Sequence, residues 1–116
     1  MDNAIDQEIQ DKGLVAPRVT PADLEAAIRD EAYFTAAQGH DAVASNDVVL
    51  ASYDSLQCLT FCVLVLQNGF TVTGESACAS PENFNAELGK KIARQNAVAK
   101  LWPLLGYELK TKLAAR

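Results

Sequence analysis

The dipeptide Asn68-Gly69 restricts the fold of this chain more than any other feature, because it separates two β-prone runs. These runs extend from Leu59 to Gln67 and from Phe70 to Cys78. Asn-Gly tolerates positive φ at both positions, which a two-residue type I′ turn requires. The sequence therefore predicts an antiparallel β-hairpin with a two-residue turn.

The length of the turn determines which side chains share a face of the hairpin. A two-residue turn pairs Gln67 with Phe70, and the pairing of all later residues follows from it. One face, the expected core face, then carries Leu59, Phe61, Val63, Val65, Phe70 and Val72. The other face carries Cys62, Leu64, Leu66, Thr71, Thr73 and Glu75. Because the run from Leu59 to Leu66 is apolar on both sides, we expect a central strand with some cover on each face.

Two helix starts flank the hairpin in sequence. Thr20-Pro21 places a hydroxyl N-cap before a proline, and predicts a helix from there to about Ala37. Ser80-Pro81 has the same pattern, and predicts a second helix that runs to Trp102 and is ended by Pro103. A short tail helix is expected over residues 108–113.

A third strand is predicted at residues 48–53, where the sequence is Val-Val-Leu-Ala-Ser-Tyr. The fold class is therefore α+β, with a three-stranded antiparallel sheet, two helices on one face and the element order α-β-β-β-α. At 116 residues the chain suits a single domain. We assign that domain to residues 20–116, and residues 1–19 to a flexible acidic segment.

The hairpin and the helix after it resemble a family of small tailed-phage proteins named after gene-49 and gene-66 products. The likeness lies in residues 59–78, Ser80-Pro81-Glu82-Asn83-Phe84, Gly89-Lys90-Lys91-Ile92-Ala93-Arg94, Asn96-Ala97, Trp102-Pro103-Leu104 and Gly106-Tyr107. This resemblance implies a phage or prophage protein made in the cytoplasm of a bacterial host. It implies no catalytic residue, ligand or cofactor.

Charge and composition narrow the classes of partner. The net charge of −5 opposes binding to phosphate backbones, so nucleic-acid binding would need a local basic patch. The longest apolar run is shorter than a membrane span, and the first residues lack the pattern of a signal peptide, so we expect a soluble protein that is not exported. Three cysteines in such a protein are expected to remain unpaired thiols.

No constellation for metal binding or catalysis is evident. In the two-residue register Cys78 lies on the opposite face from Cys58 and Cys62, and His40 is the single histidine, so zinc ligands do not converge. A nucleophile needs a base within hydrogen-bond reach, and the sequence suggests no such pair. We therefore expect a non-enzymatic protein without a cofactor.

The best candidate for a partner surface joins a basic cluster on the last helix to the half-polar face of the hairpin. It comprises Lys90, Lys91, Arg94, Leu64, Leu66, Thr71, Thr73 and Glu75. The plainer interpretation of the cluster is pairing with Glu87 on a solvated helix face. On the same helix we expect Asn96 to bond to backbone either of the hairpin or of the return from Pro103 to Tyr107, and Gly89 to permit close approach.

The sequence is best explained by a phage accessory protein that binds a host or defence protein. Two alternatives stay open. The helix–three strands–helix order is that of double-stranded-RNA-binding domains, although the acidic first turn of the last helix differs from their lysine-rich one. Self-association is the second alternative, because sheets with open edges readily pair.

Overall fold

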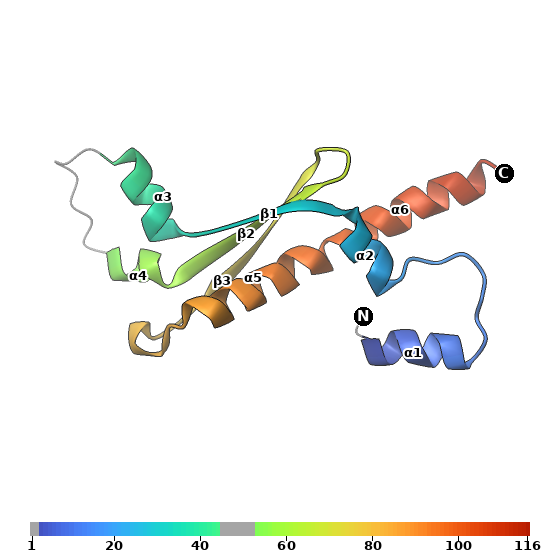
Figure 1. Ribbon diagram of the computed structural model, residues 1–116, viewed down its shortest axis with the longest axis horizontal. Coiled ribbons are helices and arrows are strands. Elements are labelled where there is room, and N and C mark those ends of the chain that lie inside the picture. The colour runs from blue at the N-terminus through green and yellow to red at the C-terminus, as the bar shows by residue number, and fades with distance from the viewer. Residues whose placement is uncertain (1–2, 45–52) are drawn as a thin grey trace.

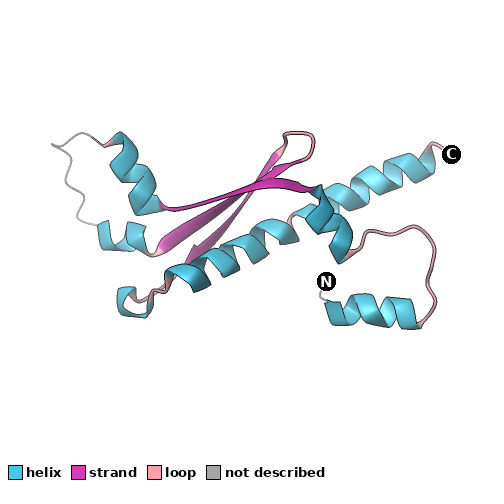
Figure 2. Cartoon of the chain, in the orientation of Figure 1, coloured by secondary structure: helices cyan, strands magenta, loops and turns pink. Residues whose placement is uncertain are grey.

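The computed structural model describes residues 3–44 and 53–116. A three-stranded antiparallel sheet of order β1-β2-β3 forms its centre, with β1 at Ile28–Thr35, β2 at Leu59–Leu66 and β3 at Thr71–Ala77. Helix α5 (Ala86–Ala99) packs along one face of β2 and β3, as Figures 1 and 2 show. The predicted α+β class with a three-stranded antiparallel sheet is confirmed.

The first helix begins where the sequence predicted but ends ten residues early. Thr20 and Asp23 form a capping box at the start of α2 (Pro21–Ala27), and Ile28 is already extended. The residues expected to continue the helix form β1, because pairing with β2 satisfies their backbone and outweighs the helical spacing of their apolar side chains. A second capping box, between Thr35 and Gln38, starts α3 (Ala36–Val43).

The first strand of the described sheet is β1, which lies earlier in the chain than the strand predicted at residues 48–53. Residues 48–52 of that prediction lie outside the described residues, and Tyr53 begins the short helix α4 (Tyr53–Gln57). The order α2-β1-β2-β3-α5 keeps the expected α-β-β-β-α arrangement, with α3 and α4 inserted between β1 and β2. Leu24 of α2 belongs to the same buried core as Ala93 and Ala97 of α5, so both helices contribute to one core.

The hairpin exists, but its turn has three residues and the predicted register is wrong by one. Leu66 N–H donates to Phe70 O at 2.8 Å, and Gly69 N–H donates to Leu66 O at 2.9 Å. Gly69 has a φ of +89°, whereas Asn68 has no positive φ and instead accepts a bond from Phe70 N–H through Oδ1 at 2.9 Å. This is a tight turn followed by a left-handed glycine, a common three-residue hairpin loop.

The shifted register exchanges the two faces of β2. Val65 now pairs with Thr71 and Leu64 with Val72. The face beneath α5 carries Thr60, Cys62, Leu64, Leu66, Val72 and Gly74, all of them buried. The opposite face carries Leu59, Phe61, Val63 and Val65, the β2 residues that were expected in the core, because a slip of one residue moves every side chain of a strand to the other face of its partner. Val72 alone of the expected core residues is buried beneath α5.

Small residues allow α5 to lie close to the sheet. Gly89, Ala93 and Ala97 recur every four residues and are its buried positions. A β-carbon at Gly74 would overlap the backbone of Ala93 and Ala97, and one at Gly89 would lie 2.9 Å from Thr60 Oγ1. The expected close approach at Gly89 is confirmed.

The last helix of the prediction is divided into three pieces. Ser80-Pro81 starts only a 3-10 turn, η1 (Pro81–Asn83), and Asn85 caps α5 instead. After a break at Lys100, helix α6 (Leu101–Ala114) replaces the short tail helix. Pro103 lies in the first turn of α6, where the missing N–H costs no helical bond, and so it does not end a helix.

The ends of the chain project from this body (Figure 1). Helix α1 (Asn3–Asp11) lies in the segment expected to lack packed elements, and none of its residues is buried. Arg18 ties it to the linker through a 2.6 Å ion pair with Asp6. The molecule measures 60 × 29 × 17 Å and has a radius of gyration of 18.3 Å, against about 13 Å for a compact chain of this length.

Candidate protein-binding surface

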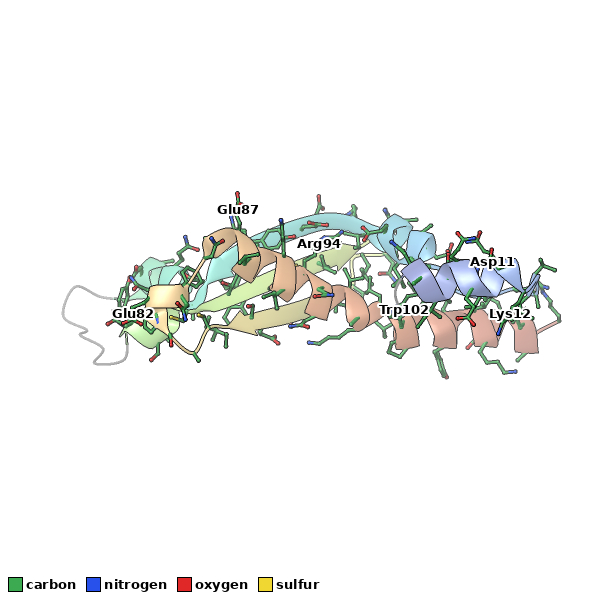
Figure 3. The ribbon with its side chains drawn as sticks, turned by 90° about the horizontal axis from the view of Figure 1, so that it is seen from below. Asp11, Lys12, Glu82, Glu87, Arg94 and Trp102 are labelled. Atoms are coloured by element: carbon green, nitrogen blue, oxygen red, sulfur yellow. The ribbon has the colours of Figure 1, made fainter. Side chains whose placement is uncertain are left out.

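The sheet face turned away from α5 is apolar and has no helix packed across its centre among the described residues. In Figure 3 α5 crosses in front of the strands, and the other face lies behind them. Phe61, Val63 and Val65 are half-buried there, and Phe34 is 39% exposed. We call this the open sheet face and define it by Ala32, Phe34, Phe61, Val63, Val65, Thr71, Thr73 and Glu75.

An aromatic pair anchors one end of the open sheet face. Phe34 of β1 and Phe61 of β2 are register partners, and their ring centroids lie 5.4 Å apart. Such a pair offers a large, rigid apolar area at low entropic cost, which is typical of the centre of a protein interface. The arrangement can bind an apolar protein surface.

Acidic side chains flank this apolar area. Asp30, opposite Val65, and Glu75, opposite Phe61, are both exposed. Arg29 at the bulge in β1 lies 3.4 Å from Asp30, and the three strands contain no lysine. The open sheet face is therefore apolar in its centre and acidic at its margins.

The structure places the hairpin residues of the predicted partner surface on opposite faces of the sheet. Thr71, Thr73 and Glu75 are exposed on the open sheet face. Leu64 and Leu66 are 0% and 9% exposed beneath α5, so their prediction as surface residues is wrong. The cause is again the one-residue shift in register, which moves them into the core.

The basic cluster does not act as one surface, because Arg94 is already engaged. Its guanidinium binds two carboxylates that come from different elements: Nη2 lies 2.6 Å from Glu25 Oε2 in α2 and 2.7 Å from Glu31 Oε1 in β1. We call Glu25, Glu31 and Arg94 the clamp. Lys90 lies over the Tyr33 ring, 6.0 Å from its centroid. Lys91 is exposed, and within the described residues neither it nor Glu87 forms an ion pair.

The clamp shifts the titration of its members. Hydrogen bonds from Arg94 hold the pKa of Glu25 and that of Glu31 below their usual range. Burial, with a hydrogen bond to Glu31 Oε2 at 2.8 Å, raises the pKa of Tyr33. Both carboxylates therefore stay charged and fasten α2 and β1 to α5, which is a structural role.

The cysteines lie on one face, contrary to the register expected from the sequence. Cys78 is opposite Cys58, and its N–H donates to Cys58 O at 3.0 Å. All three are free thiols, and burial raises the pKa of Cys62. In the described part of the chain no group of three His, Cys, Asp or Glu side chains is placed to hold a metal ion.

The expected role of Asn96 is confirmed, because its Nδ2 donates to the hairpin backbone at Glu75 O over 2.7 Å.

One buried side-chain polar atom, Thr60 Oγ1 beneath Gly89, has no hydrogen-bond partner among the described residues. Thr60 also lines a hollow of about 270 Å³ beside Tyr33 and Lys90.

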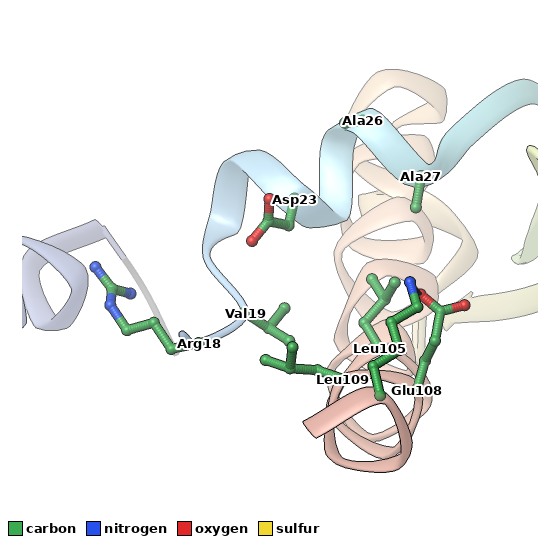
Figure 4. Close-up of a pocket in the computed structure, with 9 residues that line it drawn as sticks. Arg18, Val19, Asp23, Ala26, Ala27, Leu105, Glu108 and Leu109 are labelled. Atoms are coloured by element: carbon green, nitrogen blue, oxygen red, sulfur yellow. Dashed lines mark hydrogen bonds and ion pairs between the residues drawn. The ribbon is translucent and has the colours of Figure 1, made fainter. Parts of the chain in front are cut away.

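A second surface lies between α2 and α6, as Figure 4 shows. This groove of about 360 Å³ has an apolar floor and charged side chains of both signs along it. We call it the α2–α6 groove and define it by Arg18, Val19, Asp23, Ala26, Ala27, Leu105, Glu108, Leu109 and Lys112.

The sequence contained one signal for the open sheet face. A strand that is apolar on both sides indicated cover on each face. Helix α5 covers one face, and on the other face α3 approaches only the end at Phe34, so no described helix covers the centre of that face. Phe34 could not be found this way, because its segment was predicted as helix.

Comparison with known proteins matches residues 19–113 to the model of the family described as Phage protein (N4 Gp49/phage Sf6 gene 66) family. No curated protein and no solved structure matches the chain. Among the described helices, none has the length and apolar character required to cross a membrane.

Proposed function

We propose that this chain, which belongs to the Phage protein (N4 Gp49/phage Sf6 gene 66) family, is a non-enzymatic accessory protein that binds another protein through its open sheet face. One observation carries the proposal: Phe61, Val63 and Val65 form a half-buried apolar area on the face away from α5, and Phe34 beside it stays 39% exposed although α3 approaches its ring. Contiguous exposed apolar patches on small proteins mark interaction sites.

The charge around the open sheet face indicates which charge the partner surface carries. Asp30 and Glu75 flank the apolar centre, and the whole chain carries a net charge of −5. Complementary potentials speed association and exclude like-charged surfaces. The partner surface is therefore basic with an apolar centre, as surfaces that bind nucleic acid are. A host or defence protein in the bacterial cytoplasm fits that description.

The same charges argue against two other occupants of this face. A second copy would bring its own acidic margin against Asp30 and Glu75. A nucleic acid would meet strands without a single lysine, while Arg94 of α5 is neutralised by Glu25 and Glu31. Phosphate binding depends on cations that are free to replace counterions.

A site-specific cross-linking experiment tests the proposal. A photoreactive phenylalanine is placed at Phe34 on the open sheet face, or at Lys91 on the outer side of α5 as the matched control. The protein is produced in the bacterial host and irradiated, and the attached protein is identified by mass spectrometry. We expect a defined adduct from position 34 and none from position 91.

The identified partner is then purified and titrated with the chain. Val63→Lys places a charge in the apolar centre, and we expect it to weaken binding at least about tenfold, whereas Lys91→Gln has no effect. Raising the salt concentration should weaken binding by slowing association. A partner that binds Val63→Lys and the unaltered chain equally well would refute the assignment to this face.

A further inference from the structure

Helix α6 is apolar over its first two turns and charged over its last two, where it carries Glu108, Lys110 and Lys112, and little of the described chain covers it. Its Leu101 is buried, but Leu104 is 41% exposed and Tyr107 is 78% exposed. Fourteen helical residues extend over about 21 Å, and among the described elements the helix makes its main contacts with α2 and α5. Leu104, Leu105 and Leu109 are only partly covered by the described chain, and neighbouring exposed apolar side chains mark contact sites.

The α2–α6 groove beside this helix carries charges in a balanced set. Leu105, Leu109 and Val19 form its apolar floor (Figure 4). The side chains along it comprise two cations, Arg18 and Lys112, and two carboxylates, Asp23 and Glu108. The groove is therefore neutral in a protein with a net charge of −5, unlike the acidic open sheet face.

Balanced charges of this kind suit a symmetric contact. In a two-fold interface the same patch meets itself, so residue i of one copy contacts residue j of the other and the reverse. A patch of a single sign repels its own copy, whereas one that bears Glu108 and Lys112 one turn apart complements itself when two helices run antiparallel. Within one chain these two side chains form an exposed ion pair at 3.4 Å, a weak interaction in water that contacts with the second copy can replace.

We propose that the α2–α6 groove is the interface of a two-fold symmetric dimer, in which α6 packs antiparallel to α6 of a second copy. Leu105 and Leu109 then lie in the centre, and Glu108 of each copy faces Lys112 of the other. The elongated shape of the single chain agrees with this, because its projecting helix gains cover in the dimer. The proposal is independent of the open sheet face, which stays accessible.

Sedimentation equilibrium of the full chain over a wide concentration range provides the test. We expect a species of twice the 12.5 kDa chain mass. Leu109→Glu should raise the dimer dissociation constant at least about tenfold, because it buries an unpaired charge. The matched control is Leu88→Glu, which alters a leucine of α5 that is 56% exposed and should leave the dimer intact.

A charge exchange tests the orientation of the helices. Glu108→Lys and Lys112→Glu should each weaken the dimer about threefold or more, and the double variant should recover most of the loss. Circular dichroism establishes that each variant keeps its fold. A monomer at all concentrations overturns the proposal, and so does a dimer that resists Leu109→Glu. Val63→Lys, which disables the open sheet face, should dimerise normally, so the two proposals fail separately.

Discussion

Gly74 of β3 lies so close to Ala93 of α5 that a β-carbon at position 74 would overlap the carbonyl oxygen of Ala93. The helix and the sheet therefore meet backbone to backbone at this point, and the contact sets the height of α5 above the core. The buried residues Cys62 and Leu64 lie in the layer that this contact closes.

Gly74→Ala should destabilise the protein by at least about 2 kcal/mol, because overpacking at a rigid backbone contact forces the helix away from the sheet. Urea unfolding at pH 7 measures the effect. Gly106→Ala is the matched control: this glycine in α6 has open space around its β-position, and alanine should add up to about 1 kcal/mol. Equal effects of the two changes would contradict the close contact.

Arg94→Gln should cost about 1 kcal/mol at pH 7, a modest amount because the side chains of the clamp are 30–56% exposed and screened by water. The folded-state pKa of Glu25 and of Glu31 is lowered, so this stability is present above the unfolded-state pKa and lost as pH falls through the folded-state pKa. Urea unfolding at pH 7 and pH 3 should therefore show the difference between variant and wild type shrinking in acid.

Lys91→Gln provides the control for Arg94, since it removes a neighbouring cation that forms no ion pair in the described structure. It should change stability by less than about 0.5 kcal/mol at either pH. A pH-independent loss in Arg94→Gln would show that the side chain acts by packing rather than by charge.

Thr60→Val should stabilise the protein by about 1 kcal/mol. Thr60 Oγ1 is buried beneath Gly89 without a partner among the described residues, and a buried hydroxyl without a bond carries a desolvation penalty that valine lacks. Thermal unfolding followed by circular dichroism measures the gain. Thr73→Val on the open sheet face serves as control, and a loss of stability at position 60 alone would show that the hydroxyl has a partner.

The chain should not retain duplex RNA or single-stranded DNA in a mobility-shift titration at low salt. The α-β-β-β-α order is present, but α5 begins at Ala86 with Glu87 in its first turn, and Arg94 is held by two carboxylates. Retention that weakens with salt and is lost in Lys90→Gln or Lys91→Gln would reverse this expectation.

Local chemistry predicted the features that depend on a few adjacent residues. The capping box at Thr20, the hairpin at Asn68-Gly69 and the bond from Asn96 to the hairpin were all foreseeable, because each depends on the hydrogen bonding of one or two side chains or of one turn. The predicted α+β class and the family resemblance also depend on the hairpin and the helix that follows it.

Pairing between distant residues decided the rest. Residues 28–35 have helical spacing and yet form β1, because the open edge of β2 offered them hydrogen bonds that no local pattern reveals. One extra residue in the turn then exchanged the faces of β2, burying Leu64 beneath α5 and leaving Phe61 and its neighbours half-buried on the other face. Turn and cap chemistry can be read locally, whereas strand partners and register depend on the free energy of the whole sheet, and for this reason the tertiary structure alone placed the candidate surface.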